Sequence, residues 1–159
     1  QSNLKLASGI APVEKMLAKG ITVGLGTDGA TSNNNLDMLE ETRLTAILHK
    51  SVTLDPLCIP AAAAWDMATY QGAKCLGYNN LGKLEKGWLA DIVLYDMNKP
   101  YWYPRNDRMS LLVYAAYATD ADTAIINGKV VMEKGEVKAL DAEKIYYKAN
   151  KIAKRLTGK

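Results

Sequence analysis

The stretch from Ile21 to Gly29, ITVGLGTDG, decides how the rest of the chain is interpreted. Residues 21–25 form a short apolar run rich in β-branched side chains, which predicts a strand buried on both faces. The stretch also contains three glycines in the G-x-G-x-x-G spacing of dinucleotide-binding loops. The choice is therefore between a cofactor loop and a strand that carries Asp28 into a site.

A dinucleotide loop would need a different continuation of the chain. Its strand passes directly into a helix whose N–H groups face the pyrophosphate, and an acidic residue follows about 20 positions later at the tip of a second strand. Here the polar run TSNNN comes before any predicted helix, and the segment about 20 residues on is itself predicted to be helical. Asp28 would also set a carboxylate against the pyrophosphate. The spacing therefore does not predict nucleotide binding.

Asp28 itself has two possible roles. It follows the predicted strand, and sites in barrels and open parallel sheets assemble at the carboxyl ends of strands. A carboxylate there can ligate a divalent metal and accept a hydrogen bond from an attacking water. Alternatively, Asp28 caps the following turn through backbone N–H groups, a common use of Asp before Gly. The local residues leave both roles open.

Helices are predicted around this strand. Residues 11–19 give a short amphipathic helix with Pro12 at its first position and Gly20 after its end. After the loop TSNNN, apolar periodicity over residues 36–48 predicts a second helix, and the alanine-rich residues 60–76 predict a third. We therefore expect residues 1–79 to form one mainly helical segment around a single buried strand.

A β-rich part is expected over residues 80–140. The run LGKLEKGWLADIVLYD predicts short strands around Lys86-Gly87, and TAIINGKVVMEKGEV predicts two strands joined by Asn127-Gly128, a strong hairpin signal. Residues 110–118 between them predict a helix. A last helix is expected over residues 141–159, capped by Asp141, with an apolar stripe formed by Ile145, Ala149, Ile152 and Leu156.

Composition narrows the classes of function. Among 159 residues, 20 Lys and Arg oppose 17 Asp and Glu, so the net charge is +3, and charges of both signs are interspersed. This pattern predicts neither a nucleic-acid partner nor a membrane surface. No apolar run approaches the length of a membrane helix and no signal peptide opens the chain, so the cytoplasm is expected. Cys58 and Cys75 are expected to be buried free thiols.

The histidine, one further aspartate and the tryptophans could in principle act in catalysis or binding, but we expect them to have structural roles. His49, the only histidine, falls at the end of the second predicted helix, where a cationic ring would suit the helix dipole, and we do not expect it to ligate a metal. Asp91 precedes a predicted strand and is expected to be a turn or edge residue. The tryptophans are expected to pack in the core because no basic stripe accompanies them, and they are Trp65, Trp88 and Trp102.

Five motifs in order carry a resemblance that covers nearly the whole chain. They are SNLKLASG, GITVGLGTDGATSNNNLDMLEE, ATYQGAKCLG, LGKLEKGWLADIVLYD and AIINGKVV. Together they resemble the carboxyl-terminal part of the amidohydrolase superfamily. Within it they are most similar to the branch of deaminases acting on S-adenosylhomocysteine and 5′-methylthioadenosine, with the triazine chlorohydrolases as relatives.

The resemblance implies an α/β fold: a (β/α)8 barrel of the TIM type, followed by part of a small β-sandwich and a C-terminal helix. It implies one divalent metal, zinc first and iron or manganese as alternatives, held by an H-x-H pair, two further histidines and an aspartate ending the eighth strand. Asp28 matches that aspartate and would both ligate the metal and steer the attacking hydroxide. Ser32 and Asn33, on the loop leaving the strand, would contact a nucleoside substrate. A homo-oligomer is expected.

The chain also departs from this pattern. No H-x-H occurs, and a catalytic metal site usually needs about three protein ligands, of which this chain offers one. We therefore expect a fragment of a longer enzyme that is inactive as the isolated 159 residues. Two other functions remain open: a chlorotriazine-type chlorohydrolase or other cyclic amidine hydrolase, and a non-catalytic structural or dimerisation module in which Asp28 is only a turn residue.

Overall fold

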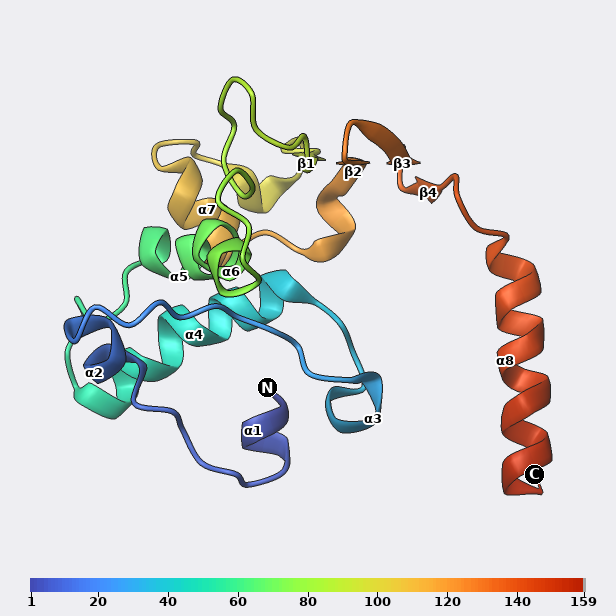
Figure 1. Cartoon of the computed structure of the whole chain (residues 1–159), viewed down its shortest axis with the longest axis horizontal. Coiled ribbons are helices and arrows are strands. Elements are labelled where there is room, and N and C mark those ends of the chain that lie inside the picture. The colour runs from blue at the N-terminus through green and yellow to red at the C-terminus, as the bar shows by residue number, and fades with distance from the viewer. Residues whose placement is uncertain (159) are drawn as a thin grey trace.

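The computed structural model describes residues 1–158, in which a helical body lies beside an antiparallel sheet and a last helix stands apart (Figure 1). The α-helices are α1 (Ser2–Lys5), α2 (Val13–Ala18), α3 (Ala30–Asn33), α4 (Met38–Thr53), α5 (Ala61–Ala68), α6 (Tyr70–Cys75), α7 (Arg108–Tyr114) and α8 (Ala142–Thr157). The strands and 3₁₀ helices are β1 (Ile92–Tyr95), η1 (Pro100–Trp102), η2 (Ala118–Asp120), β2 (Ala121–Ile126), β3 (Lys129–Glu133) and β4 (Glu136–Val137).

Aspartate side chains begin the longer helices. Asp37 accepts from the backbone N–H groups of Leu39 (2.9 Å) and Glu40 (3.0 Å) at the start of α4. Asp107 caps α7 in the same way, and Asp141 accepts from Lys144 N (3.0 Å) at the start of α8, as predicted. These carboxylates satisfy N–H groups that have no partner within the helix.

Residues 21–25, predicted to be a strand, form an extended segment that pairs with no strand in the described part of the chain. The prediction of a strand was therefore wrong for residues 1–158. A strand needs a ladder of hydrogen bonds to a neighbour, and the four-stranded sheet does not include this segment. It lies instead along the helical body, with Leu25 N donating to Met67 O at 3.2 Å. A Cβ on Gly24 would lie 2.9 Å from Gly72 Cα, so close packing, not a pyrophosphate, accounts for this glycine.

The third predicted helix is broken into α5 and α6. Thr69 between them has φ −120° and ψ −94°, outside helical values, so the prediction of one helix over 60–76 was wrong. Its hydroxyl donates to Trp65 O at 2.8 Å, the carbonyl that a continuing helix would engage. A smaller correction concerns TSNNN, because part of this loop belongs to the one-turn helix α3.

The antiparallel sheet has the order β1-β2-β3-β4. Asn127 (φ 48°) and Gly128 (φ 75°) join β2 to β3 in left-handed conformations, which confirms the predicted hairpin. Asp91 at the start of β1 accepts from Asn127 N at 2.7 Å, as expected of an edge or turn residue. Of the short strands expected on the two sides of Lys86-Gly87, the later one is confirmed as β1, while the earlier one is absent from the described residues. Residues 81–91 form turns and irregular structure, with Trp88 N donating to Glu85 O at 3.1 Å.

The core consists of two adjoining clusters between the helices. One joins α2, α4, α5 and α7 and contains Val13, Ala46, Ile59, Ala61, Ala64, Met67 and Val113. The other surrounds Trp102, and Trp65 packs against both clusters. Trp88 is half-buried and its ring lies 5.8 Å from that of Tyr70, so all three tryptophans serve packing, as predicted. Since α7 packs on α4 and α5, the segments on the two sides of residue 80 share a core.

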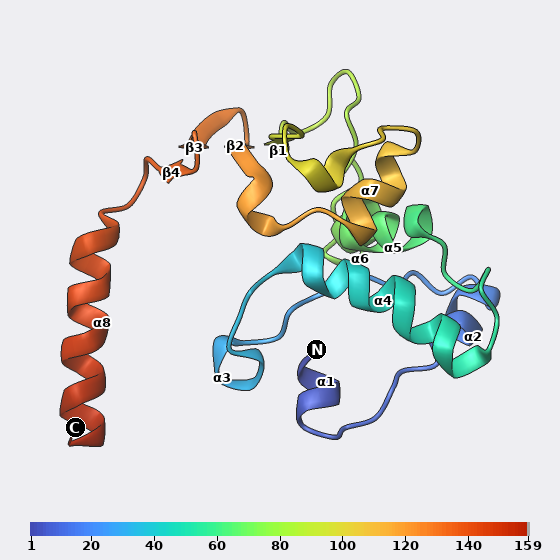
Figure 2. The ribbon, with the colours of Figure 1, turned by 180° about the vertical axis from the view of Figure 1, so that it is seen from behind.

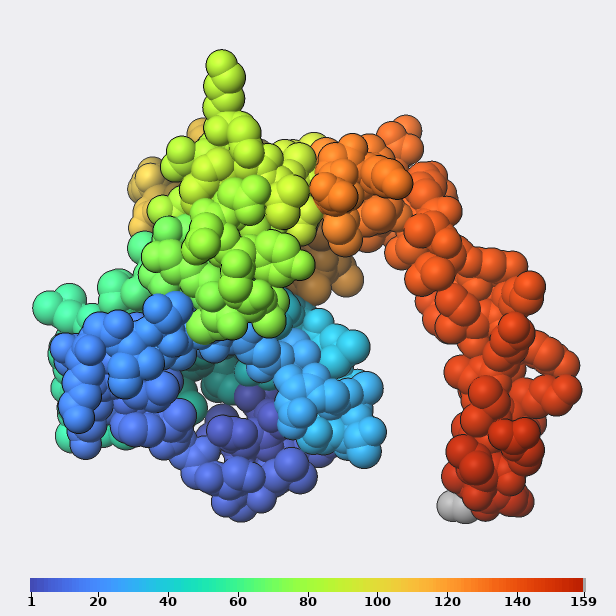
Figure 3. All heavy atoms as spheres, viewed as in Figure 1, coloured from blue at the N-terminus to red at the C-terminus, as the bar shows by residue number. Residues whose placement is uncertain are grey.

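Helix α8 stands away from this body, as the views from the front and from behind agree (Figure 2). None of its described residues is buried, and its apolar stripe includes Ile145, Ile152 and Leu156, all exposed. The space-filling view shows the helix joined to the rest through the end of the sheet (Figure 3). The helix predicted after Asp141 is therefore confirmed, while its apolar face has no partner within residues 1–158.

Two composition-based expectations can be compared with the fold. Within residues 1–158, no helix combines the length and the apolar character that crossing a bilayer requires. Cys58 and Cys75 are free, as expected, but neither is buried: Cys58 is half-buried and Cys75 is exposed. Cys75 is the last residue of α6 and the next residue, Leu76, is also exposed, which explains the exposure of Cys75; its Sγ lies 3.8 Å from Thr22 O.

Candidate functional site

Asp28 ends the extended segment that crosses the helical body. Its φ of 63° is left-handed, a conformation that Asp tolerates better than most residues because its short side chain bonds locally. Oδ1 accepts from Gly29 N at 2.7 Å. This backbone hydrogen bond first, and the Ser32 hydroxyl second, hold the pKa of the exposed Asp28 carboxyl below its usual value. The carboxylate is therefore anionic at neutral pH and accessible to a cation or a water.

Two motifs that lie apart in the sequence meet beside Asp28. Lys5, from SNLKLASG, donates through Nζ to Ser32 O (2.9 Å) and to Asn34 Oδ1. Ser2, from the same motif, is buried, and its hydroxyl also lowers the pKa of Asp28. Contacts between α1 and α3 thus bring the first residues of the chain against the turn that carries the carboxylate.

Asn33 is buried beneath this turn, with 3 % of its surface exposed. Its Nδ2 donates to Thr27 O (2.7 Å) and to Glu41 Oε1 (2.9 Å). Its Oδ1 is buried and has no hydrogen-bond partner within residues 1–158. A substrate contact by Asn33 would therefore use Oδ1 as an acceptor, because both donor positions are engaged. Ser32 is half-buried next to it.

The donor set near Asp28 fits one ligand position of a divalent metal and not a complete site. An anionic, exposed carboxylate oxygen is a suitable donor for zinc, iron or manganese. Residues 1–158 contain no group of three or more His, Cys, Asp or Glu side chains able to hold a metal ion. Any further ligands would have to come from outside these residues.

His49 is buried on α4 against α2. Its Nδ1 is 3.7 Å from Glu14 Oε2 and makes no hydrogen bond. Burial lowers the pKa of the ring, and the nearby Glu14 charge opposes this only in part. Desolvation therefore outweighs the Glu14 charge and disfavours the cationic form that would suit a helix end.

Sequence reasoning missed Lys5 and Glu41. Glu41 is 8 % exposed, although charged residues are seldom buried unless they are paired. The signal that could have found Glu41 is its place in α4. Glu41 lies on the buried side of this helix, as Thr42 and His49 do, where a charged side chain needs a partner. Lys5 gave no local signal, because its partners are 27 and 29 residues away.

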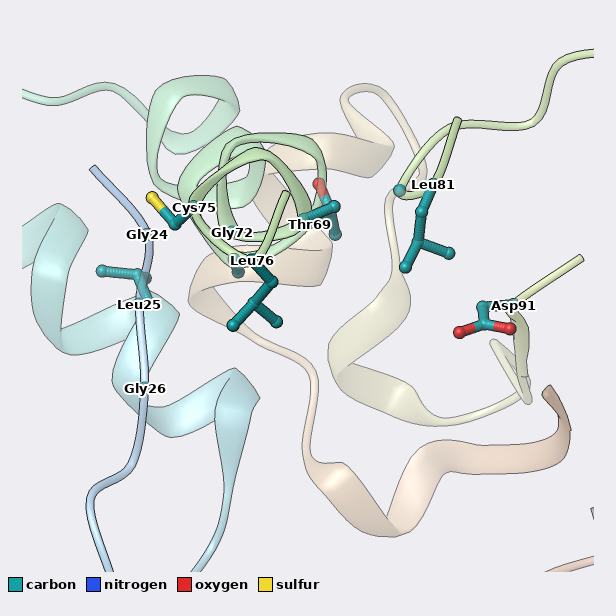
Figure 4. Close-up of a pocket in the computed structure, with 12 residues that line it drawn as sticks. Gly24, Leu25, Gly26, Thr69, Gly72, Cys75, Leu76, Leu81 and Asp91 are labelled. Carbon is teal, nitrogen blue, oxygen red and sulfur yellow. The ribbon is translucent and has the colours of Figure 1, made fainter. Parts of the chain in front are cut away.

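A hollow of about 560 Å³ lies away from Asp28. It opens between Gly24–Gly26, α6 and the segment from Leu81 to Asp91, as Figure 4 shows. Its polar side chains are Thr69 and Asp91, and the Asp91 carboxylate already accepts from Asn127 N. This hollow therefore lacks convergent chemistry, and Asp28 remains the candidate site although it does not line this hollow.

The family of this chain is shown by its match to a sequence model of a protein family. The model of the amidohydrolase family matches residues 1–131, which include all the motifs around Asp28. The chain belongs to the amidohydrolase family. This membership confirms the resemblance drawn from the five motifs. The Asp28 turn lies within the region that the family model matches.

Several amidohydrolases are similar over the whole chain. A 5-methylthioadenosine/S-adenosylhomocysteine deaminase of Dictyoglomus thermophilum is 57% identical over 159 residues, all of this chain and 37% of the relative. One of Moorella thermoacetica is 55% identical over 152 residues, 95% of this chain and 36% of the relative. The chain thus spans little more than a third of the length of these curated relatives.

Solved structures of amidohydrolases have the same fold. A zinc-bound adenosine deaminase from Xanthomonas campestris matches with a TM-score of 0.95 and 34% identity, over 99% of this chain and 36% of that one. A zinc complex of an atrazine chlorohydrolase from Arthrobacter aurescens matches with a TM-score of 0.83 and 32% identity, over 94% of this chain and 33% of that one. The fold described above, α8 included, therefore recurs within larger structures.

Proposed function

We propose that this chain is the carboxyl-terminal part of a metal-dependent amidohydrolase that deaminates an adenosine-type nucleoside, either S-adenosylhomocysteine, 5′-methylthioadenosine or a related compound. The observation that carries the proposal is the anionic, exposed Asp28 carboxylate, on which two sequence motifs converge. The relatives named as deaminases of these nucleosides, at 57% and 55% identity, support the substrate class.

The proposal includes an arrangement for the chain within the intact protein. The segment 21–26 would be the last strand of a (β/α)8 barrel, lying against strands that this chain does not contain. The β-rich residues 80–140 would be part of a small sandwich, and residues 141–159 its C-terminal helix. The extended course of residues 21–26 supports the barrel assignment, because such a segment exposes backbone groups that a neighbouring strand can pair.

The reaction is the replacement of an amino group by water. When bound, a divalent ion, zinc by preference, would supply a water activated as a nucleophile at neutral pH. Asp28 would be one of the residues that hold this ion, and its carboxylate would accept the proton of the attacking water. Water adds to the purine carbon that bears the amino group, and ammonia leaves.

Ser32 and Asn33 are proposed to contact the substrate side. Asn33 Oδ1 is a buried acceptor without a partner in residues 1–158, and a hydroxyl or amino donor of a nucleoside would satisfy it. The half-buried Ser32 hydroxyl lies close enough to lower the pKa of Asp28, so it would stand between the carboxylate and the substrate. The missing ligands and the group that carries the proton to the leaving ammonia would come from the remaining length of the protein.

A second candidate function is chlorohydrolysis of a triazine, favoured by the TM-score of 0.83 with a chlorohydrolase structure. The nucleoside is preferred because the curated deaminases are far more similar in sequence. A third is a non-catalytic structural module, in which the Gly29 N–H bond would be the whole role of Asp28.

The deciding experiment assays the intact protein. Metal content is measured, and the protein is incubated with S-adenosylhomocysteine, 5′-methylthioadenosine, adenosine and a chlorotriazine, with ammonia and chloride release measured in parallel. We expect ammonia from at least one nucleoside and one bound divalent ion for each chain. Chloride release alone would favour the second candidate, and no turnover with no bound metal would leave the non-catalytic module. Cell fractionation and light scattering would test the expected cytoplasmic location and homo-oligomer.

A further inference from the structure

We propose that Glu41 is a positioning residue for Asp28: through Asn33 it holds the Thr27–Asp28 turn in the conformation that the reaction needs. This inference rests on the proposed function. Glu41 is the last residue of the motif that contains Asp28, and its side chain hydrogen-bonds to Asn33 and not to the Asp28 side chain.

The chain of contacts begins on a rigid element. Glu41 lies in the first turn of the 16-residue helix α4, whose start is fixed by the Asp37 cap. From there Glu41 Oε1 accepts from Asn33 Nδ2 at 2.9 Å, and its Oε2 accepts from the main-chain nitrogen of Gln1 at 2.9 Å. One buried carboxylate therefore connects α4 to α3.

The contacts end at the turn that carries the carboxylate. The same Asn33 Nδ2 donates to Thr27 O at 2.7 Å, the carbonyl immediately before Asp28. Gly29 O in turn accepts from Asn33 N at 3.0 Å and from Ser32 N at 3.1 Å. The carbonyls on both sides of Asp28 are thus held by Asn33, whose side chain is oriented by Glu41.

The conformation of Asp28 makes such support necessary. A non-glycine residue at φ 63° lies in a sparsely populated region, and it persists there only when its surroundings define it. Its own side-chain bond to Gly29 N is exposed, whereas the bond between Glu41 and Asn33 is buried and protected from competing water. The buried pair is therefore the stronger determinant of where the carboxylate points.

Stability alone does not require a carboxylate at position 41. Burying a charged group is costly, and a complete buried polar pair can often be replaced by apolar side chains without loss of stability, whereas removing one partner alone destabilises. Glu41→Met keeps the length and apolar contacts of the side chain but removes the acceptor. Glu41→Gln keeps an acceptor for Asn33 Nδ2. Glu40→Gln is the matched control, because Glu40 is adjacent and accepts only from the exposed Asn35 in residues 1–158.

The experiment uses the intact protein and two readouts, measured at a temperature at which every variant is folded. For Glu41→Met we expect kcat to fall about 10²-fold with KM changed by only a few fold, the usual cost of misplacing a catalytic group by about 1 Å. Amide hydrogens of residues 27–34 should exchange about tenfold faster, because the turn loses its buried support. Glu41→Gln should recover most of both losses, and Glu40→Gln should match wild type.

A lowered Tm for Glu41→Met with unchanged kcat and unchanged exchange in residues 27–34 would overturn the proposal and leave Glu41 a stabilising residue. Should the Met variant not fold, Asn33→Ser, which removes the same link to Thr27 O, decides by the same exchange readout. The exchange result does not depend on turnover. An intact protein that turns over no nucleoside would refute the proposed function, while the exchange readout would still accept or reject the role of Glu41 in holding the turn.

Discussion

Asp28 combines a left-handed backbone, a lowered pKa and an exposed carboxylate within one residue. The lowered pKa has a local cause, the N–H of Gly29, and so would persist in any turn of this geometry. Asp96 illustrates the point: it is remote on the far end of β1, accepts from Asn98 N at 2.9 Å and also has a lowered pKa. What distinguishes Asp28 is its neighbours, Ser2, Lys5 and Asn33, which come from two separate motifs.

The first prediction compares these two aspartates in the intact protein. Asp28→Asn should lower kcat by about 10²-fold to 10⁴-fold, because it removes the charge that attracts the metal and the group that accepts the water proton. Thermal stability without metal should change little, since Asn is nearly the same size. Asp96→Asn removes a similar hydrogen-bonded carboxylate and should leave kcat unchanged.

Steady-state kinetics with metal content measured on each sample would check this prediction. Excess zinc should restore the occupancy of the Asp28→Asn protein more fully than its rate. Activity of Asp28→Asn within a few fold of wild type would identify Asp28 as a turn residue only, because Asn caps turns nearly as well as Asp.

The second prediction concerns the single histidine. Burial lowers the pKa of His49 below its ordinary value of 6.5, so between the lowered pKa and 6.5 the unfolded state binds more protons than the folded state. The free energy of unfolding should therefore decrease as pH falls below about 6.5. His49→Gln should remove this part of the pH dependence. Glu14→Gln should make it steeper, because the Glu14 charge raises the pKa of the ring.

Urea unfolding of the intact protein at a series of pH values between about 5 and 8 would measure these differences. Only the difference between each variant and wild type is interpreted, since other groups also titrate in this range. A wild-type profile parallel to that of His49→Gln would contradict the assignment of a buried neutral ring.

The elements differ in how much of their geometry is local. The β2–β3 hairpin depends on two consecutive left-handed residues, Asn127 and Gly128, and on the bond from Asn127 N to Asp91. Helices α4, α7 and α8 each begin at an aspartate that accepts backbone hydrogen bonds. By contrast, the break between α5 and α6 depends on how Thr69 packs and bonds, and not on a helix-breaking residue.

The third prediction tests the hairpin. Gly128→Ala should lower the free energy of unfolding by about 1 kcal/mol, because a Cβ is unfavourable at its φ of 75°. Asn127→Gly should be nearly neutral, since glycine adopts the left-handed conformation readily. Urea unfolding curves of the two variants and wild type would give both values, and an equal cost for both would argue against the left-handed turn.

At the scale of the whole molecule, the helical body and the sheet share a core, whereas α8 and the segment 21–26 have faces with no partner in residues 1–158. The same arrangement recurs in an adenosine deaminase structure of which this chain covers only 36%. The unpartnered faces agree with the proposal that the chemistry of this chain depends on further residues.

The fourth prediction follows at this scale. The isolated 159-residue chain should bind zinc, iron or manganese only weakly, because one carboxylate and waters cannot hold such an ion as a site with several histidines does. Equilibrium dialysis against each metal would measure the affinity, with the Asp28→Asn chain as control. Tight binding of one ion for each chain that is lost in the control would show that residues 1–159 contain a complete site.

Sequence alone determined the features whose physics is local. The Asp141 cap and the left-handed conformations of Asn127 and Gly128 depend on residues adjacent or three positions apart, and the position of Asp28 at the end of an apolar run could be read in the same way. Only the tertiary structure decided that residues 21–25 lie unpaired, that Thr69 interrupts a helix, that His49 is desolvated, and that Lys5 and Glu41 converge on the Asp28 turn. The physical reason is that strand pairing, desolvation and buried hydrogen bonds depend on partners distant in the chain, and those partners are brought together only by packing of the whole core.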